Sequence, residues 1–240
     1  MLTIVCFVLS VFAQTPSVET ILDNVDRNMN FETRTAQIQM TVTRGRRVKV
    51  YEMNSFARGA NEAAIEFNAP ARDRGTKMLK RGGELWMYMP SIEKVQKISG
   101  HMLRQGMMGS DLSYEDLMET TQFRALYDAT IVGEEEQNGR ACWRLELTAK
   151  SEDVAYPRRT TWVDKEHMVP VHEELYALSG MVVKSWDLSD VQTFGERHFP
   201  TRMVISDQLQ TGSQTEVLFQ EMSFSVALEE EVFSQRWLDR

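Results

Sequence analysis

Apolar and polar residues alternate along two long stretches, and this period of two constrains the fold more than any other feature of the sequence. The apolar positions are Ala36, Ile38, Met40 and Val42 in the first stretch, and Trp143, Leu145 and Leu147 in the second. Successive side chains of a β-strand point to opposite faces, so the pattern is typical of strands with one buried face. Turn dipeptides separate the strand-like runs: Gly82-Gly83, Asn138-Gly139, Ser179-Gly180 and Thr211-Gly212. The runs between Arg34 and Val226 predict about ten or eleven antiparallel strands.

Three helices are expected beside these strands. Thr15 as the N-cap, Pro16 in the first turn and an apolar stripe from Val18 to Met29 predict an opening helix of roughly 15 residues. A second helix is predicted from Ser113 to about Asp128, because Ser113 and Asp116 have the spacing of a capping box. A short third helix is predicted from Glu229 to Leu238.

The predicted fold class is mainly β with α: a long, curled antiparallel sheet with helices on its concave face. So many strands cannot stay flat, because strand twist accumulates across a sheet. Helices with a single apolar stripe must bury it against the sheet, which encloses an apolar space. Side chains fill that space or leave it open as a cavity. No linker divides the chain, so residues 14–240 are predicted to form one domain.

The first thirteen residues resemble a secretory signal peptide. The run from Leu2 to Phe12 is apolar and uncharged, and Val11 and Ala13 suit the positions before a cleavage site. Its length is well below the roughly 20 residues that span a bilayer. We expect export and removal of residues 1–13; the alternative is a buried N-terminal strand or helix. The mature chain would then keep Cys142 as its single cysteine.

Composition excludes several classes of protein. The chain has 27 Lys and Arg against 35 Asp and Glu, a formal net charge of −8, which argues against nucleic-acid binding. A hydrophobic fraction of 42% with five Trp and eleven Phe excludes global disorder. Two cysteines are too few for a disulfide scaffold or a multi-cysteine zinc site.

Two segments carry a resemblance to a known family. They are Gly75–Leu117 (GTKMLKRGGELWMYMPSIEKVQKISGHMLRQGMMGSDLSYEDL) and Thr161–Glu174 (TWVDKEHMVPVHEE), followed later by Phe199-Pro200-Thr201-Arg202-Met203. The chain resembles the periplasmic outer-membrane lipoprotein-sorting proteins, which are related to the Lol-type lipoprotein carrier. The resemblance implies an incomplete antiparallel β-barrel closed by helices, around an apolar cavity for the acyl chains of lipoproteins or lipids. It also implies a periplasmic, monomeric carrier that works with an inner-membrane exporter and an outer-membrane acceptor; the cargo does not carry over.

Twelve residues are candidates for the cavity or a lid over it. They are Met40, Trp86, Tyr88, Met102, Leu103, Met107, Met108, Trp143, Leu145, Trp162, Val171 and Leu175. Trp86 and Tyr88 lie in the bulky run Leu85–Met89, which is either a strand packed on both faces or one that lines the cavity. The glycine-hinged, Met-rich segment His101–Leu112 is either a lid or a loop that plugs the barrel end. The strand candidates Trp143, Leu145, Trp162, Val171 and Leu175 belong either to an ordinary core or to a cavity lining, since the two share their chemistry.

Catalysis is not expected. His172-Glu173-Glu174 has the composition of a metal or general-base site, but in a strand Glu173 points away from its two neighbours. The sequence contains no G-x-S-x-G elbow, P-loop or G-x-G-x-x-G motif. We therefore expect a non-enzymatic carrier with no cofactor and no metal. The competing hypothesis is a lipid- or lipoprotein-sensing module that regulates a partner in the cell envelope. His101 and Arg104 either meet a lipid headgroup or are simply solvated.

Overall fold

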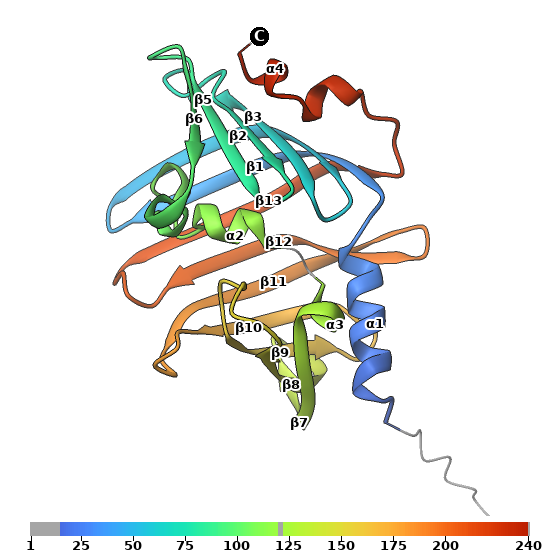
Figure 1. The fold of residues 1–240 in the computed structure, drawn as a ribbon. Coiled ribbons are helices and arrows are strands. Elements are labelled where there is room, and N and C mark those ends of the chain that lie inside the picture. Colours follow the sequence, from blue (N-terminus) through green and yellow to red (C-terminus); the bar gives the residue numbers. More distant parts are fainter. Residues whose placement is uncertain (1–14, 120–121, 240) are drawn as a thin grey trace, which may run out of the picture.

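The protein is one large antiparallel β-sheet with a few short helices, as seen in a computed structural model (Figure 1). The structure describes residues 15–119 and 122–239, so the predicted signal peptide lies outside the described residues. The strands are β1 (Thr33–Arg44), β2 (Arg47–Arg58), β3 (Glu62–Ala69), β4 (Lys77–Arg81), β5 (Glu84–Met89), β6 (Lys94–Ile98), β7 (Tyr127–Gln137), β8 (Arg140–Ala149), β9 (Arg158–Asp164), β10 (Pro170–Tyr176), β11 (Val182–Phe194), β12 (Arg197–Asp207) and β13 (Ser213–Phe224). Their order in the sheet is β6-β5-β4-β3-β2-β1-β13-β12-β11-β10-β9-β8-β7.

The mainly β class is confirmed, but the predicted number of strands is too low. The described residues form a 13-stranded sheet, whereas the sequence pattern predicts about ten or eleven strands. Two of the strands do not alternate: the first four residues of β4 are all buried, and the first four of β6 are all exposed. A period-two search does not resolve strands of this kind. The sheet is not closed, since β6 and β7 stand at its two ends.

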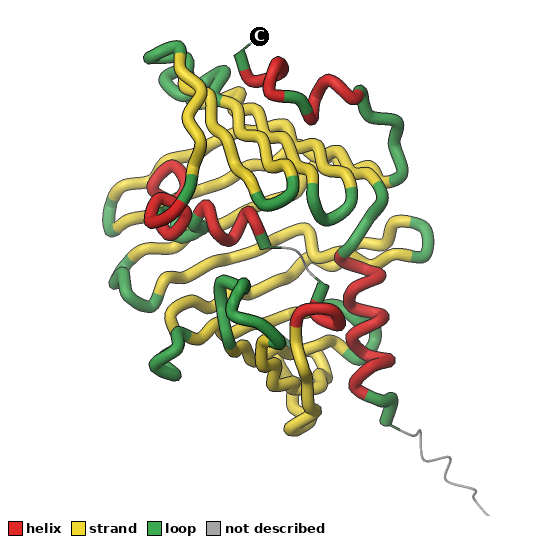
Figure 2. Tube along the Cα trace, in the orientation of Figure 1, coloured by secondary structure: helices red, strands yellow, loops and turns green. Residues whose placement is uncertain are grey.

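One connection crosses the whole sheet. β6 and β7 follow one another in the chain but lie at opposite edges, so the residues between them run over one face. This connection contains η1 (Gly100–Arg104), η2 (Met107–Gly109), α2 (Tyr114–Met118) and α3 (Phe123–Leu126). Met107 and Tyr114 in it pack in one apolar cluster with Met40 and Met53 of the sheet. Figures 1 and 2 show α2 lying over the sheet. We call the face that it covers the inner face and the opposite one the outer face.

The first helix forms as predicted but begins later. α1 spans Val18–Met29, and its N-cap is Ser17, whose Oγ accepts a hydrogen bond of 3.2 Å from the Thr20 amide. Its apolar stripe buries Ile21, Leu22 and Val25 against a cluster that includes Trp143, Leu145 and Leu147 of β8. The predicted stripe is therefore confirmed, whereas Thr15 and Pro16 precede the helix.

The second predicted helix, from Ser113 to about Asp128, is wrong in its extent. The capping box is present, with the Ser113 amide 2.6 Å from Oδ2 of Asp116, but α2 ends at Met118. Glu119 is extended, and its carboxylate lies 2.8 Å from the Arg159 guanidinium. α3 is a separate short helix, and Asp128 already belongs to β7.

The third predicted helix is divided as well, and it lies on the outer face. Ser234, in an extended conformation, separates η3 (Glu230–Phe233) from α4 (Gln235–Leu238). Phe233 and Leu238 pack against Ala64 and Leu79. Ala64 and Leu79 alternate with Ile65 and Met78, which belong to the inner-face cluster, so the C-terminal segment covers the outer face. The expectation that the helices share one face is therefore wrong for this segment.

Candidate ligand-binding pocket

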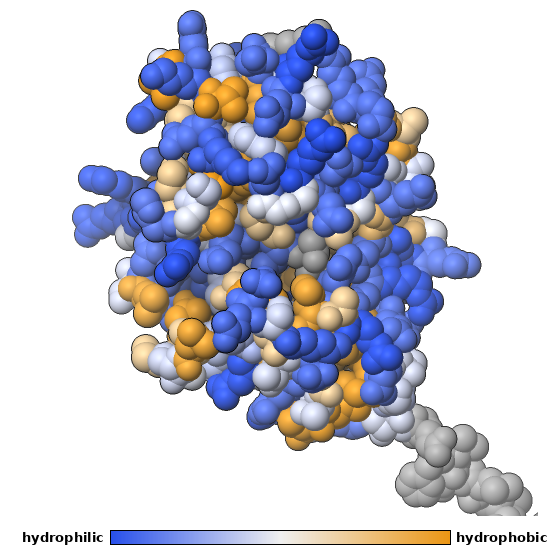
Figure 3. Space-filling model, in the orientation of Figure 1, coloured by the Kyte–Doolittle hydropathy of each residue, from blue (hydrophilic) through white to orange (hydrophobic). Residues whose placement is uncertain are grey.

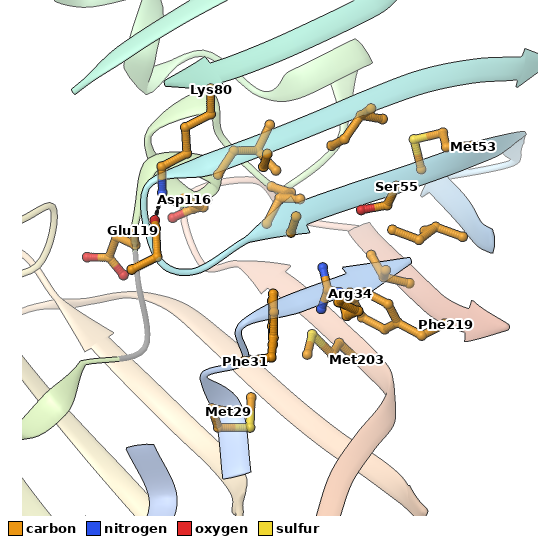
Figure 4. Close-up of a pocket in the computed structure, with 18 of the residues that line it drawn as sticks. Met29, Phe31, Arg34, Met53, Ser55, Lys80, Asp116, Glu119, Met203 and Phe219 are labelled. Carbon is orange, nitrogen blue, oxygen red and sulfur yellow. Dashed lines mark hydrogen bonds between the residues drawn. The ribbon is translucent and has the colours of Figure 1, made fainter. Parts of the chain in front are cut away.

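A pocket of about 260 Å3 opens on the inner face (Figure 4). Most of its walls are apolar side chains from β1, β2, β3, β12 and β13, and Leu117 of α2 and Met107 of the crossing connection complete it. The apolar lining comprises Met29, Phe31, Ile38, Met40, Met53, Ala57, Ala60, Ala63, Ile65, Met107, Leu112, Leu117, Trp186, Phe199, Met203, Ile205, Val217 and Phe219. Ile38 and Met40 are among the alternating residues of the sequence, which explains why one strand supplies several of the walls.

The Met-rich segment is fastened over the inner face by polar contacts. Tyr51 donates a hydrogen bond of 3.1 Å to the carbonyl of Met108, and the Asp111 amide donates one of 2.8 Å to Oγ1 of Thr215. Thr215 in turn donates to the Asp111 carboxylate at 2.7 Å. A side chain at Gly106 would stand 2.1 Å from the Ser110 carbonyl oxygen, so only glycine fits this turn. The segment is held at several points, and motion as a lid remains a prediction.

A buried polar network ties α2 to the other half of the sheet. Asp116 accepts a hydrogen bond of 2.6 Å from Tyr156 and forms an ion pair with Lys184 of β11. Arg159 of β9 lies 2.8 Å from Glu119 and 3.0 Å from Glu173. Burial raises the pKa of the Glu173 carboxyl, and the Arg159 guanidinium opposes that shift. The network fixes one end of the pocket.

Every carboxylate in the pocket lining has a cationic partner. Glu62 lies 2.6 Å from Nε of Arg58, while Asp116 and Glu119 are paired as described above. The partner cations, Arg58, Lys184 and Arg159, are not themselves part of the lining. The negative charges of the walls are therefore neutralised from outside the pocket.

Two cations of the lining have no such carboxylate partner among the described residues. Lys80 donates from Nζ to the carbonyls of Ala60 and Met118, both at 2.9 Å, and burial lowers the pKa of its ammonium group to about 8. Arg34 lies among aromatic rings, with its guanidinium carbon 4.6 Å from the ring centre of Phe31 and 5.1 Å from that of Phe219. Burial lowers the pKa of Arg34 to about 10, and its Nε has no hydrogen-bond partner.

Sequence reasoning missed both cations. The signal for Arg34 was present, since it precedes Ala36, Ile38 and Met40 at the same spacing of two and therefore shares their buried face. Lys80 gave no such signal, because β4 does not alternate.

The predicted cavity residues are distributed over five places. Met40 and Met107 line the pocket. Met102, Leu103 and Met108 pack against the same inner-face cluster without lining it. Trp143 and Leu145 lie in the separate cluster beneath α1. Trp86 and Tyr88 pack with the C-terminal segment on the outer face, while Leu85 and Met87 face inward, so β5 is packed on both faces.

The last three candidates lie in the β8–β10 half of the sheet. Trp162 and Val171 form a small cluster with Cys142, and Leu175 is buried. None of the three lines the pocket. Cys142 alternates away from Trp143 as predicted, and burial raises the pKa of its thiol to about 11.

The other singled-out polar residues do not converge on the pocket. His101 and Arg104 are exposed. His172 lies 2.7 Å from Asp187, whereas Glu173 bonds Arg159, as opposite directions along a strand require. Within residues 15–119 and 122–239, no group of three or more His, Cys, Asp or Glu side chains has an arrangement that could hold a metal ion. In that same part of the chain, no helix is long and apolar enough to cross a membrane.

Comparison with solved structures identifies the fold. A DUF1329 family protein from Desulfovibrio piger has 24% sequence identity and a TM-score of 0.82, with 92% of this chain and 97% of that chain covered. A putative outer membrane lipoprotein-sorting protein domain from Vibrio parahaemolyticus has 22% identity and a TM-score of 0.80, covering 92% and 98%. A LolA superfamily protein from Nitrosomonas europaea has 21% identity and a TM-score of 0.76, covering 93% and 100%. No curated protein matches the chain.

These likenesses define the class: a protein with the open antiparallel sheet of the LolA-like lipoprotein-sorting structures, as the sequence resemblance indicated. Within that class, the chain belongs to the family whose model matches residues 59–240 and is described as "Uncharacterized protein".

Proposed function

We propose that the protein is a non-enzymatic carrier that holds an acyl chain of a lipoprotein or lipid in the inner-face pocket. The observation that supports this most directly is the pocket itself, a space of about 260 Å3 walled by methionine, isoleucine, valine and phenylalanine side chains. Apolar walls of this kind suit a hydrocarbon tail, because burial of each methylene contributes about 0.8 kcal/mol. The LolA-like fold of the chain fits the same function.

Release of the cargo requires a free-energy cost of loading that offsets part of the gain from burying the tail. A tail of roughly fifteen carbons would gain about 12 kcal/mol in a rigid dry cavity, which would then act as a trap. A pocket of about 260 Å3 is slightly smaller than the common ligand sites of about 300–1,000 Å3. A long tail must therefore displace lining side chains, and the flexible thioethers of Met40, Met53, Met107 and Met203 are suited to repacking. Unloading lets these side chains pack together again, and this repacking favours release.

The proposal places the protein in the periplasm, after removal of residues 1–13. There it would take cargo from an inner-membrane exporter and pass it to an outer-membrane acceptor. It would act as a monomer and without a cofactor. Residues 14–240 would form the single carrier domain.

The test is to identify what the protein carries. Protein purified from its native host is extracted with organic solvent, and the extract is analysed by mass spectrometry for acyl chains. Uptake of a fluorescent fatty acid is measured in parallel for the wild type and for Ala57→Phe, which places a ring in the pocket. Ala141→Phe, at an exposed position of β8, is the matched control. We expect acyl chains in the extract, and loss of uptake in Ala57→Phe alone. A protein that is consistently empty and takes up no fatty acid would contradict the proposal.

A further inference from the structure

The charges of the pocket lining are not balanced within the pocket. Its three acidic residues are each paired with a cation that stands behind the wall, which leaves their charge neutralised. Its two basic residues, Arg34 and Lys80, form no ion pair among the described residues. The pocket of a protein with a formal net charge of −8 is therefore locally cationic.

Arg34 is the better placed of the two to meet a ligand. The ammonium group of Lys80 already donates to two backbone carbonyls, whereas Nε of Arg34 has no partner. The Arg34 guanidinium contacts the faces of Phe31, Phe199 and Phe219, with its carbon 4.6, 5.8 and 5.1 Å from the ring centres. Figure 4 shows it between Phe31 and Phe219, with the Met203 side chain nearby. Aromatic faces hold the cation in place but accept few of its hydrogen bonds, and its buried Nε donor has no partner.

A cation among apolar side chains costs free energy unless an anion or a hydrogen-bond acceptor pairs with it. An arginine has five N–H donors in a planar fork that matches a carboxylate or a phosphate. Apolar walls weaken the competing hydration and strengthen a charge-assisted hydrogen bond formed there. An anion beside Arg34 would therefore be bound with its charge compensated, and an attached hydrocarbon tail would lie along the methionine and isoleucine side chains.

We propose that the ligand is an anionic amphiphile, whose carboxylate or phosphate is bound by the Arg34 guanidinium while its tail occupies the pocket. This inference rests on the proposed carrier function and narrows it from acyl chains in general to those that bear a negative charge. An uncharged lipid would leave Arg34 without a partner. The pocket should therefore discriminate between tails of equal length by their headgroup.

The experiment measures the affinity of the full mature chain for dodecanoate, dodecyl phosphate, dodecanol and inorganic phosphate by titration calorimetry. We expect the two anionic amphiphiles to bind about 10-fold or more tightly than dodecanol, as one charge-assisted hydrogen bond predicts. Inorganic phosphate alone should bind far more weakly than dodecyl phosphate. If it binds as tightly, the site is a free-anion site and the proposal of an amphiphile is overturned.

Variants assign the discrimination to Arg34. Arg34→Gln and Arg34→Met should bind dodecanoate no more tightly than dodecanol, with little change in the affinity for dodecanol. Arg34→Met keeps an apolar side chain among the rings, so it covers the case in which Arg34→Gln does not fold. Arg47→Gln, at an exposed position of β2, is the control and should retain the full preference. A preference for anions that survives in Arg34→Met overturns the inference.

The outcomes separate this inference from the carrier function. Equal binding of dodecanol and dodecanoate by the wild type contradicts the role of Arg34 but leaves an acyl-chain carrier intact. Failure to bind either tail contradicts the carrier function itself.

Discussion

The Oη atom of Tyr156 donates a hydrogen bond of 2.6 Å to Oδ1 of Asp116. It joins the loop between β8 and β9 to α2, and the other carboxylate oxygen of Asp116 meets Lys184. Asp116 also completes the capping box of α2. One carboxylate therefore fixes the helix that stands at the end of the pocket.

Replacement of Asp116 should be strongly destabilising. Asp116→Ala leaves the buried ammonium of Lys184 without its partner and removes the cap, and the free energy of unfolding should fall by about 3–5 kcal/mol. Tyr156→Phe, which removes one hydrogen bond, should cost about 1 kcal/mol. Urea unfolding of both variants measures the two losses of unfolding free energy. Equal losses would show that the ion pair contributes little.

Removal of Arg159 should make the free energy of unfolding depend on pH. In Arg159→Met the Glu173 carboxyl keeps the burial that raises its pKa and loses the guanidinium that opposes the rise. Its folded pKa then lies above its unfolded value, so the folded state binds more protons and stability falls as the pH rises above about 4.3. Unfolding at pH 5 and pH 8 should show a smaller loss relative to wild type at pH 5. A loss that is independent of pH would exclude Glu173 as its cause.

Lys80 should make the free energy of unfolding increase with pH at alkaline pH, opposite to the effect of Glu173. Its pKa is about 8 in the folded protein because of burial, against about 10.4 in an unfolded chain. Between these values the unfolded chain binds more protons, so this residue increases stability as the pH rises. The unfolding free energy of the wild type minus that of Lys80→Met should therefore increase from pH 8 to pH 10. An NMR titration of the Lys80 side chain gives the midpoint directly; a midpoint near 10.4 would contradict the prediction.

Met107 tests whether the pocket exchanges its own side chains for cargo. It is buried, belongs to the segment that crosses the inner face, and lines the pocket. Met107→Ala should lower the unfolding free energy by about 2–5 kcal/mol, because the side chain leaves a cavity. The same space should accept a tail at lower cost, so uptake of a fluorescent fatty acid should tighten by several fold. Met181→Ala, at an exposed position, should change neither quantity. Weaker uptake in Met107→Ala would indicate that this side chain contacts cargo instead of competing with it.

The face seen in Figure 3 is largely hydrophilic, with apolar side chains in small groups. Tests of function are best directed at residues that line the inner-face pocket.

The direction of side chains in the alternating strands, and local features of two helices, could be predicted from the sequence alone. Alternation in β1 and β8 placed Ile38, Met40 and Leu145 on buried faces, because side-chain direction in a strand depends only on position along it. The apolar stripe of α1 and the capping box of α2 were readable for the same reason, since both depend on neighbours within a few residues.

Which of these faces meet depends on long-range packing. β1 pairs with β13, and the connection between β6 and β7 crosses the sheet, so Met107 reaches the strands that line the pocket. Trp86 is a large apolar residue of the kind expected to line a cavity, yet the C-terminal segment covers it on the outer face. The role of Arg34 also depends on the fold, because two of the three aromatic rings around its guanidinium, those of Phe199 and Phe219, come from distant strands. Periodicity along the chain carries no information about such long-range partners.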